Sequence, residues 1–160
     1  MEIPANTGRE RLNINGAVDA QIQNIFIVES QRVDADFTME IFKNIEAYYH
    51  NIPYINIFSD NAKHYYCNKV KEYLKDSKIE LYKLPIYSPN MNIIEILWNY
   101  FHKVVLYNKY YEKFSGFKTA CMMFFESIHG YKGKLKSLLS LSLQKFKDIE
   151  FVCFTLKLLC

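Results

Sequence analysis

The chain has 160 residues and a formal net charge of +3, with half of its residues hydrophobic and 16% aromatic. This length suits one domain, and the composition excludes a disordered or low-complexity protein. No apolar run reaches the roughly 18 residues that cross a bilayer, and no basic segment followed by an apolar one signals secretion. We therefore expect a cytoplasmic protein with no membrane partner. The four cysteines lie far apart without a C-x-x-C pair, which favours reduced thiols over a zinc site or disulfides.

Charge is distributed unevenly along the sequence. Residues 1–62 hold nine acidic and four basic residues, whereas residues 102–147 hold nine lysines and two acidic residues. Such asymmetry favours a polyanionic partner, because lysines that face phosphates release condensed counterions. The alternative is that these lysines form the solvated faces of helices, and the charge pattern alone does not separate the two interpretations.

The first half of the chain alternates between strand and helix patterns. Residues 9–18 and 25–29 predict an antiparallel hairpin. Asp36 is interpreted as the N-cap of a helix that Asn51 and Pro53 terminate. Its apolar residues follow helical spacing: Phe37, Ile41, Ile45 and Tyr48.

Two further strands and a helix follow. Residues 54–58 predict a buried strand, residues 66–74 a helix and residues 79–84 another strand, which ends at a rigid loop over residues 85–89.

The second half of the chain is predicted to be helical. Asn92 suits the N-cap of a helix with Glu95 at its third position, and this helix should extend to about Leu106. Further helices are expected over residues 114–128 and 135–143. Residues 151–160 are apolar without clear periodicity and form part of a C-terminal tail that either caps the core or is loosely attached.

Two carboxylates stand at the ends of hydrophobic patterns. Asp60 follows the strand 54–58 and Glu95 lies in the first turn of the helix after Asn92, with 34 residues between them. Carboxylates placed in this way can converge on one divalent cation, since hard cations take oxygen ligands. Each also has a structural interpretation: Asp60 and Asn61 suit a turn, and Glu95 suits a capping box with Asn92.

The residues around these carboxylates resemble the DDE transposases of the Tc1/mariner and bacterial IS630 group. The resemblance rests on residues 59–64 (SDNAKH), on residues 84–98 (LPIYSPNMNIIEILW) and on the 34-residue spacing, which agrees with that group's arrangement. It extends to residues 9–17 and 105–111, and covers roughly residues 9–146.

The resemblance implies an RNase H-like α/β fold, which is a mixed sheet flanked by helices. The activity that it implies is the cleavage and transfer of DNA strands with Mg²⁺ or Mn²⁺. Asp60 matches the second of three metal-binding carboxylates and Glu95 the third. Supporting roles are expected for Asn61, His64 and Asn92. Lys103, Lys109 and Lys113 are the candidates for contacts with the DNA of transposon ends.

The first carboxylate has no clear counterpart. It should lie on the opening strand, upstream of residues 9–17, where residues 1–8 offer only Glu2. We therefore expect three parts: an N-terminal remnant (1–8), a partial catalytic domain truncated at its first strand (9–146) and a tail (147–160).

The missing strand bears on the fold because it lies in the middle of an RNase H-like sheet, beside the strand that carries Asp60. Either the neighbouring strands close the gap, or another chain supplies a strand, or the fold is marginally stable. The expected function is that of a transposase fragment that is inactive alone, completed by an upstream segment or by a homodimer. The alternative is a DNA-binding or dimerising remnant without catalysis.

Overall fold

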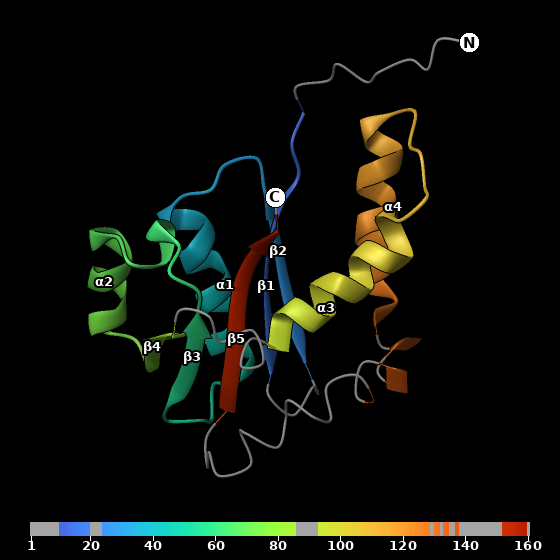
Figure 1. The fold of residues 1–160 in the computed structure, drawn as a ribbon. Coiled ribbons are helices and arrows are strands. Elements are labelled where there is room, and N and C mark those ends of the chain that lie inside the picture. Colours follow the sequence, from blue (N-terminus) through green and yellow to red (C-terminus); the bar gives the residue numbers. More distant parts are fainter. Residues whose placement is uncertain are drawn as a thin grey trace.

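The computed structural model describes residues 10–19, 24–85, 93–128, 130–131, 133–134 and 137, and the backbone of residues 152–159. Five strands form one mixed sheet in the order β2-β1-β5-β3-β4, with helices on both faces (Figure 1). This arrangement confirms the expected mixed α/β fold. Among the helices described, none is long and apolar enough to cross a membrane.

The predicted hairpin forms one side of the sheet. β1 (Asn13–Asp19) pairs antiparallel with β2 (Ile25–Ser30), from Asn13 opposite Ser30 to Val18 opposite Ile25. Every residue of β1 is buried, and its side chains alternate between two hydrophobic clusters. Ile14 and Val18 face α3 and α4, whereas Ala17 faces α1.

The centre of the sheet is formed by residues 152–159, which the sequence assigned to the tail. This strand, β5 (Val152–Leu159), pairs antiparallel with β1 and parallel with β3 (Ile55–Ser59). β3 in turn pairs parallel with the edge strand β4 (Ile79–Lys83). The gap expected in the sheet is thus closed in a way that the sequence did not suggest, by a segment of the same chain, which pairs the inner edges of β1 and β3.

The helix α1 (Ala35–Tyr48) covers one face, and its N-cap corrects the sequence interpretation. Asp34, not Asp36, is the cap, because its carboxylate accepts a hydrogen bond from the Phe37 amide at 2.9 Å. Asp36 lies inside the first turn and forms an ion pair with Lys69 of α2 (Asn68–Lys75) at 2.7 Å. Tyr48, expected on the apolar face, is exposed.

The other face is covered by α3 (Ile93–Phe101), the π-helical turn η3 (His102–Leu106) and α4 (Phe114–Glu126). The predicted end near Leu106 is confirmed. Trp98 packs so closely on β1 that a Cβ atom at Gly16 would lie 2.7 Å from its ring. Residues 86–92, which include Asn92 and most of the expected loop 85–89, lie outside the described residues, as does the expected helix 135–143 apart from residue 137.

Candidate functional site

Asp60 follows the last residue of β3, where backbone and side-chain hydrogen bonds hold the chain. Its Oδ1 accepts a hydrogen bond from the Ala62 amide at 3.1 Å, which closes a turn of the kind expected for an Asp-Asn pair. The buried Ser59 hydroxyl lies 2.6 Å from the Tyr66 hydroxyl, which donates to the Tyr82 carbonyl at 3.3 Å. The half-buried Asp60 carboxylate is therefore carried by an ordered strand end.

The strand that leads to Asp60 contacts the layer that contains Glu95. Ile55 and Ile57 of β3 pack on the α1 side, whereas Phe58 packs on the cluster that contains α3. Because side chains alternate along a strand, Phe58 faces the α3 layer two residues before Asp60, and β3 itself ends at Ser59. Glu95 lies in the first turn of α3, half-buried and with an interaction partner of its own. An acidic side chain is favoured there by the helix dipole.

His64 lies in the short helix η1 (Lys63–Tyr65), close enough to Asp60 to sense its charge. Burial lowers the pKa of His64, and the Asp60 charge opposes this shift. The ring packs against Tyr65 with centroids 4.1 Å apart, and its Nε2 is buried with no hydrogen-bond partner in the described part of the chain. The structure thus brings His64 and Asp60 together, whereas Asn61 is exposed beside them.

A third carboxylate is not supplied by the described residues. No group of three or more His, Cys, Asp or Glu side chains that could hold a metal occurs among them. The buried Asp19 belongs to a different environment, because it accepts a hydrogen bond from the Tyr49 hydroxyl at 3.2 Å on the α1 side. Burial raises the pKa of that Tyr49 hydroxyl to about 12.

The central strand explains why the set is incomplete. β5 has the sequence VCFTLKLL, without an acidic residue. Its Leu156 pairs with Ser59, the last residue of β3, and the next residue of β5, Lys157, pairs with Gly16 of β1. A pair of hard cations is held mainly by carboxylate oxygens, and this strand contributes no carboxylate. The described donor set therefore does not fit the complete metal site that the resemblance implied.

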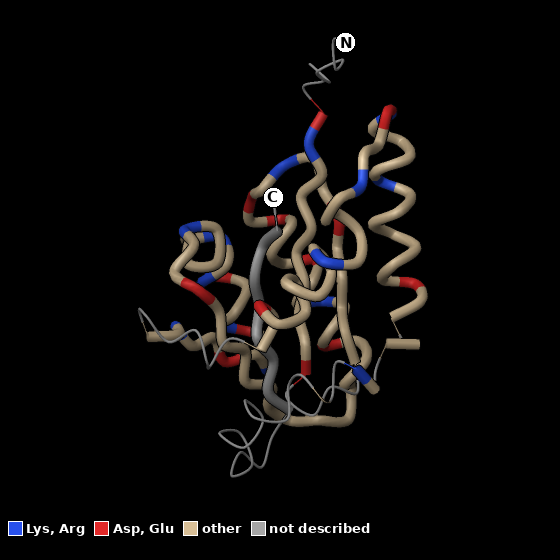
Figure 2. The backbone as a smooth tube through the Cα atoms, turned by 45° about the vertical axis from the view of Figure 1, so that its right-hand side comes forward, with Lys and Arg blue, Asp and Glu red and all other residues tan. Residues whose placement is uncertain are grey.

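The candidate DNA-contacting lysines lie on and after η3. Lys103 lines an open cavity of about 770 Å³ with Tyr100, Val104 and Lys134. Lys109 and Lys113 are exposed on the connection that leads to α4. Basic positions are not confined to this part of the molecule, because Figure 2 also shows them on α2.

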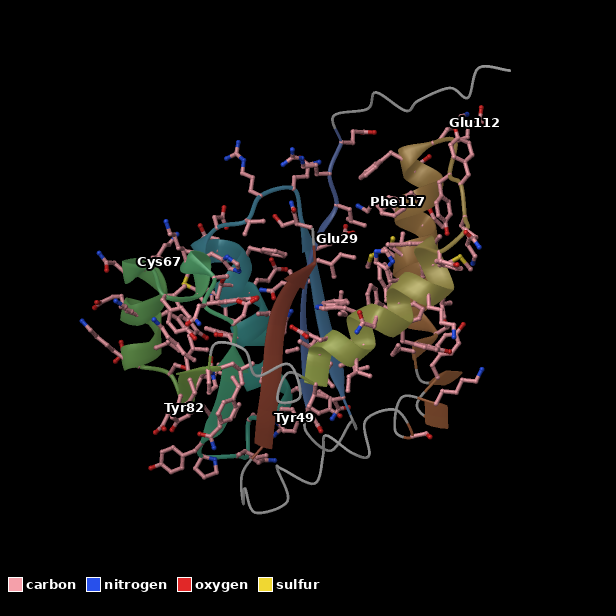
Figure 3. The ribbon with its side chains drawn as sticks, in the orientation of Figure 1. Glu29, Tyr49, Cys67, Tyr82, Glu112 and Phe117 are labelled. Atoms are coloured by element: carbon pink, nitrogen blue, oxygen red, sulfur yellow. The ribbon has the colours of Figure 1, made fainter. Side chains whose placement is uncertain are left out.

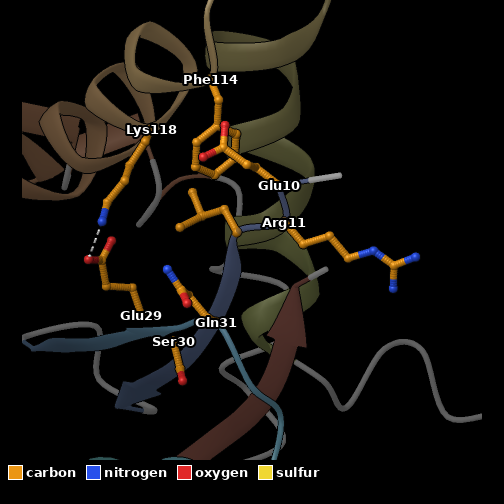
Figure 4. Close-up of a pocket in the computed structure, with 8 residues that line it drawn as sticks. Glu10, Arg11, Glu29, Ser30, Gln31, Phe114 and Lys118 are labelled. Atoms are coloured by element: carbon orange, nitrogen blue, oxygen red, sulfur yellow. Dashed lines mark ion pairs between the residues drawn. The ribbon is translucent and has the colours of Figure 1, made fainter. Parts of the chain in front are cut away.

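A second cavity, of about 540 Å³, lies between residues 10–12, which precede β1, the end of β2 and the start of α4 (Figure 4). An ion pair of 2.7 Å between Glu29 and Lys118 spans it and connects α4 to the sheet. Sequence reasoning missed this pair, because an outward carboxylate in a strand carries no signal of its partner. The cavity is lined by charges of both signs: Glu10, Arg11, Glu29 and Lys118, with Leu12, Ser30, Gln31 and Phe114.

A family model described as DDE superfamily endonuclease matches residues 2–118, which is well over half of the chain. The match includes Asp60 and Glu95 and ends within α4. No curated protein and no solved structure matches the chain.

Proposed function

Because this chain belongs to the DDE superfamily endonuclease family, we propose that it is a transposase-type protein that binds transposon-end DNA. Its relationship is to the Tc1/mariner and IS630 group, on the motifs around Asp60 and Glu95. Strand cleavage and transfer are the activities of that group, and this chain does not perform them alone. A further carboxylate from an upstream transposase segment or from a second copy is needed for them.

The observation that carries the proposed lack of cleavage is the composition of the central strand. β5 lies beside β3, the strand that ends directly before Asp60, and it contains Lys157 but no acidic residue. A divalent cation such as Mg²⁺ or Mn²⁺ would rely on oxygen ligands, and a lysine provides none. The ordered strand end and His64 keep the remnant of the site in place, and the lysines after α3 supply the attraction to phosphates.

Cleavage is tested with supercoiled plasmid DNA and purified protein in Mg²⁺ or Mn²⁺. We expect no nicking above that of Asp60→Ala. Nicking by the wild-type chain that disappears in both Asp60→Ala and Glu95→Gln would show a complete active site and refute the proposed inactivity.

DNA binding is tested separately by fluorescence anisotropy with a labelled duplex at several salt concentrations. If Lys103, Lys109 and Lys113 neutralise three phosphates, their joint replacement by alanine lowers the slope of log affinity against log salt by roughly 2.7. Lys43→Ala and Lys71→Ala, both exposed on the α1 and α2 side, are the matched controls. A wild-type chain without salt-dependent binding would exclude the DNA-binding function.

A further inference from the structure

The connection between η3 and α4 displays two tyrosines to solvent. Tyr107 is 67% exposed and Tyr110 is 65% exposed, which makes them the most exposed large hydrophobic side chains of the described residues. Figure 3 labels Glu112 on this connection, at the edge of the molecule away from β5. Two aromatic side chains three residues apart on one connection and left in water indicate a binding site, since their burial by a partner is favourable.

The connection has a fixed shape although its tyrosines are exposed. Tyr111 points inward: its hydroxyl donates to the Val105 carbonyl at 2.6 Å, and its ring packs edge-on against Phe117. The Lys109 amide donates to the Leu106 carbonyl at 3.1 Å. Asn108 between them adopts a left-handed conformation with φ of 55°, which asparagine tolerates better than most residues. Because this connection is already ordered, binding of a partner to its rings would cost the protein little conformational entropy.

The charges around the two tyrosines suit a polyanion. Lys103, Lys109 and Lys113 are exposed, and no ion pair within the described residues occupies them. Lys118, one turn into α4, differs because it is paired with Glu29. Glu112 is the acidic residue of the connection. Exposed rings among unpaired lysines are the combination that binds single-stranded nucleic acid, with bases stacked on the rings and phosphates near the lysines.

We infer that Tyr107 and Tyr110 form a stacking site for unpaired DNA bases. An unpaired strand fits better than a duplex, because the ring faces can stack only on bases that are not already stacked and paired. Tyr107 follows η3 directly and lies 12 residues beyond Glu95 in the sequence.

The experiment compares a fluorescein-labelled thymidine oligonucleotide with a duplex of equal length, by anisotropy at fixed salt. Tyr107→Ala and Tyr110→Ala are each expected to weaken binding of the single strand by roughly fivefold or more, and binding of the duplex by less than about twofold. Tyr107→Phe and Tyr110→Phe keep the ring and should bind as the wild type does. Tyr54→Ala, which removes a 56% exposed tyrosine just before β3, is the matched control and should change neither affinity.

The stacking site rests on the DNA binding proposed above, so the experiment must distinguish a failure of the stacking site from a failure of DNA binding. A wild-type chain that binds neither DNA excludes the proposed function itself. A wild-type chain that binds both, with single-strand affinity unchanged in the alanine variants, refutes the stacking site alone. Equal losses for single strand and duplex also refute it, because they indicate a general effect on phosphate binding. Far-UV circular dichroism and melting temperatures show whether a variant is folded. If an alanine variant is unfolded, the phenylalanine variants still test the stacking site, because they keep the ring and should bind as the wild type does.

Discussion

Gly16→Ala is expected to destabilise the protein, because the added methyl group has no room beneath α3. An ideal Cβ at this position lies 2.7 and 2.8 Å from two carbons of the Trp98 ring and 3.1 Å from Ile27 Cδ1. Ordinary contact begins at 3.4 Å, so that ring and strand must separate by about 0.7 Å.

The Trp98 ring cannot move away easily. It is 5% exposed and packs edge-on against Phe101 and Phe125, with centroid distances of 6.2 and 5.9 Å. Overpacking of a filled core of this kind costs about 1–3 kcal/mol of the free energy of unfolding. For a domain of this size, the melting temperature falls by roughly 2–4 °C for each kcal/mol.

The measurement is urea unfolding followed by fluorescence, for which Trp98 serves as the only tryptophan of the chain. Gly116→Ala is the matched control: a Cβ at Gly116 in α4 meets nothing within 4 Å. This substitution should stabilise the helix by about 0.5–1 kcal/mol. Gly16→Ala with unchanged or increased stability would refute the claim that close contact between Trp98 and β1 sets the position of α3, and with it that of Glu95.

Three further outcomes follow from caps, burial and charge. Asp34→Ala should lower the free energy of unfolding by about 1 kcal/mol, because α1 loses its N-cap. Asp36→Ala should have a smaller effect in the same denaturation experiment, since its ion pair with Lys69 is exposed. A larger loss of stability in Asp36→Ala than in Asp34→Ala would identify Asp36 as the cap. Burial lowers the pKa of His64 below its ordinary 6.5, so the unfolded chain takes up a proton on His64 before the folded chain does. The free energy of unfolding should therefore fall as the pH drops below about 6.5. His64→Gln should flatten that dependence, and a variant with the same pH profile as the wild type would contradict the lowered pKa of His64. Burial raises the pKa of the Cys121 thiol to about 11, so iodoacetamide at pH near 8 should leave Cys121 unmodified in the folded chain and modify it in urea, as measured by peptide mass spectrometry.

Local patterns predicted the helices and strands well wherever one face of an element is buried. The hairpin alternation, the strands at 55–59 and 79–83 and the helix from 93 onward all have a period that a few residues define. The cap of α1 was assigned wrongly, because Asp34 and Asp36 are both suitable cap residues. Only the hydrogen bond to the Phe37 amide and the ion pair with Lys69 separate their roles.

The candidate site was predictable only in part. The motifs indicated Asp60 and Glu95, and the structure packs Phe58, two residues before Asp60, against the cluster that contains α3. The burial of His64 Nε2, the Glu29–Lys118 pair and the exposure of Tyr107 carry no local signal. Each depends on which surfaces meet after folding.

The sequence by itself determined the family, the two carboxylates and the α/β character of the chain, because these follow from motifs and short-range periodicity. Only the tertiary structure decided what stands between β1 and β3. A central strand is covered on both sides and shows no alternation, and its partners Gly16 and Ser59 lie far from it in the sequence. Pairing over such distances depends on the whole sheet, and it places a strand without an acidic residue beside the strand that ends directly before Asp60.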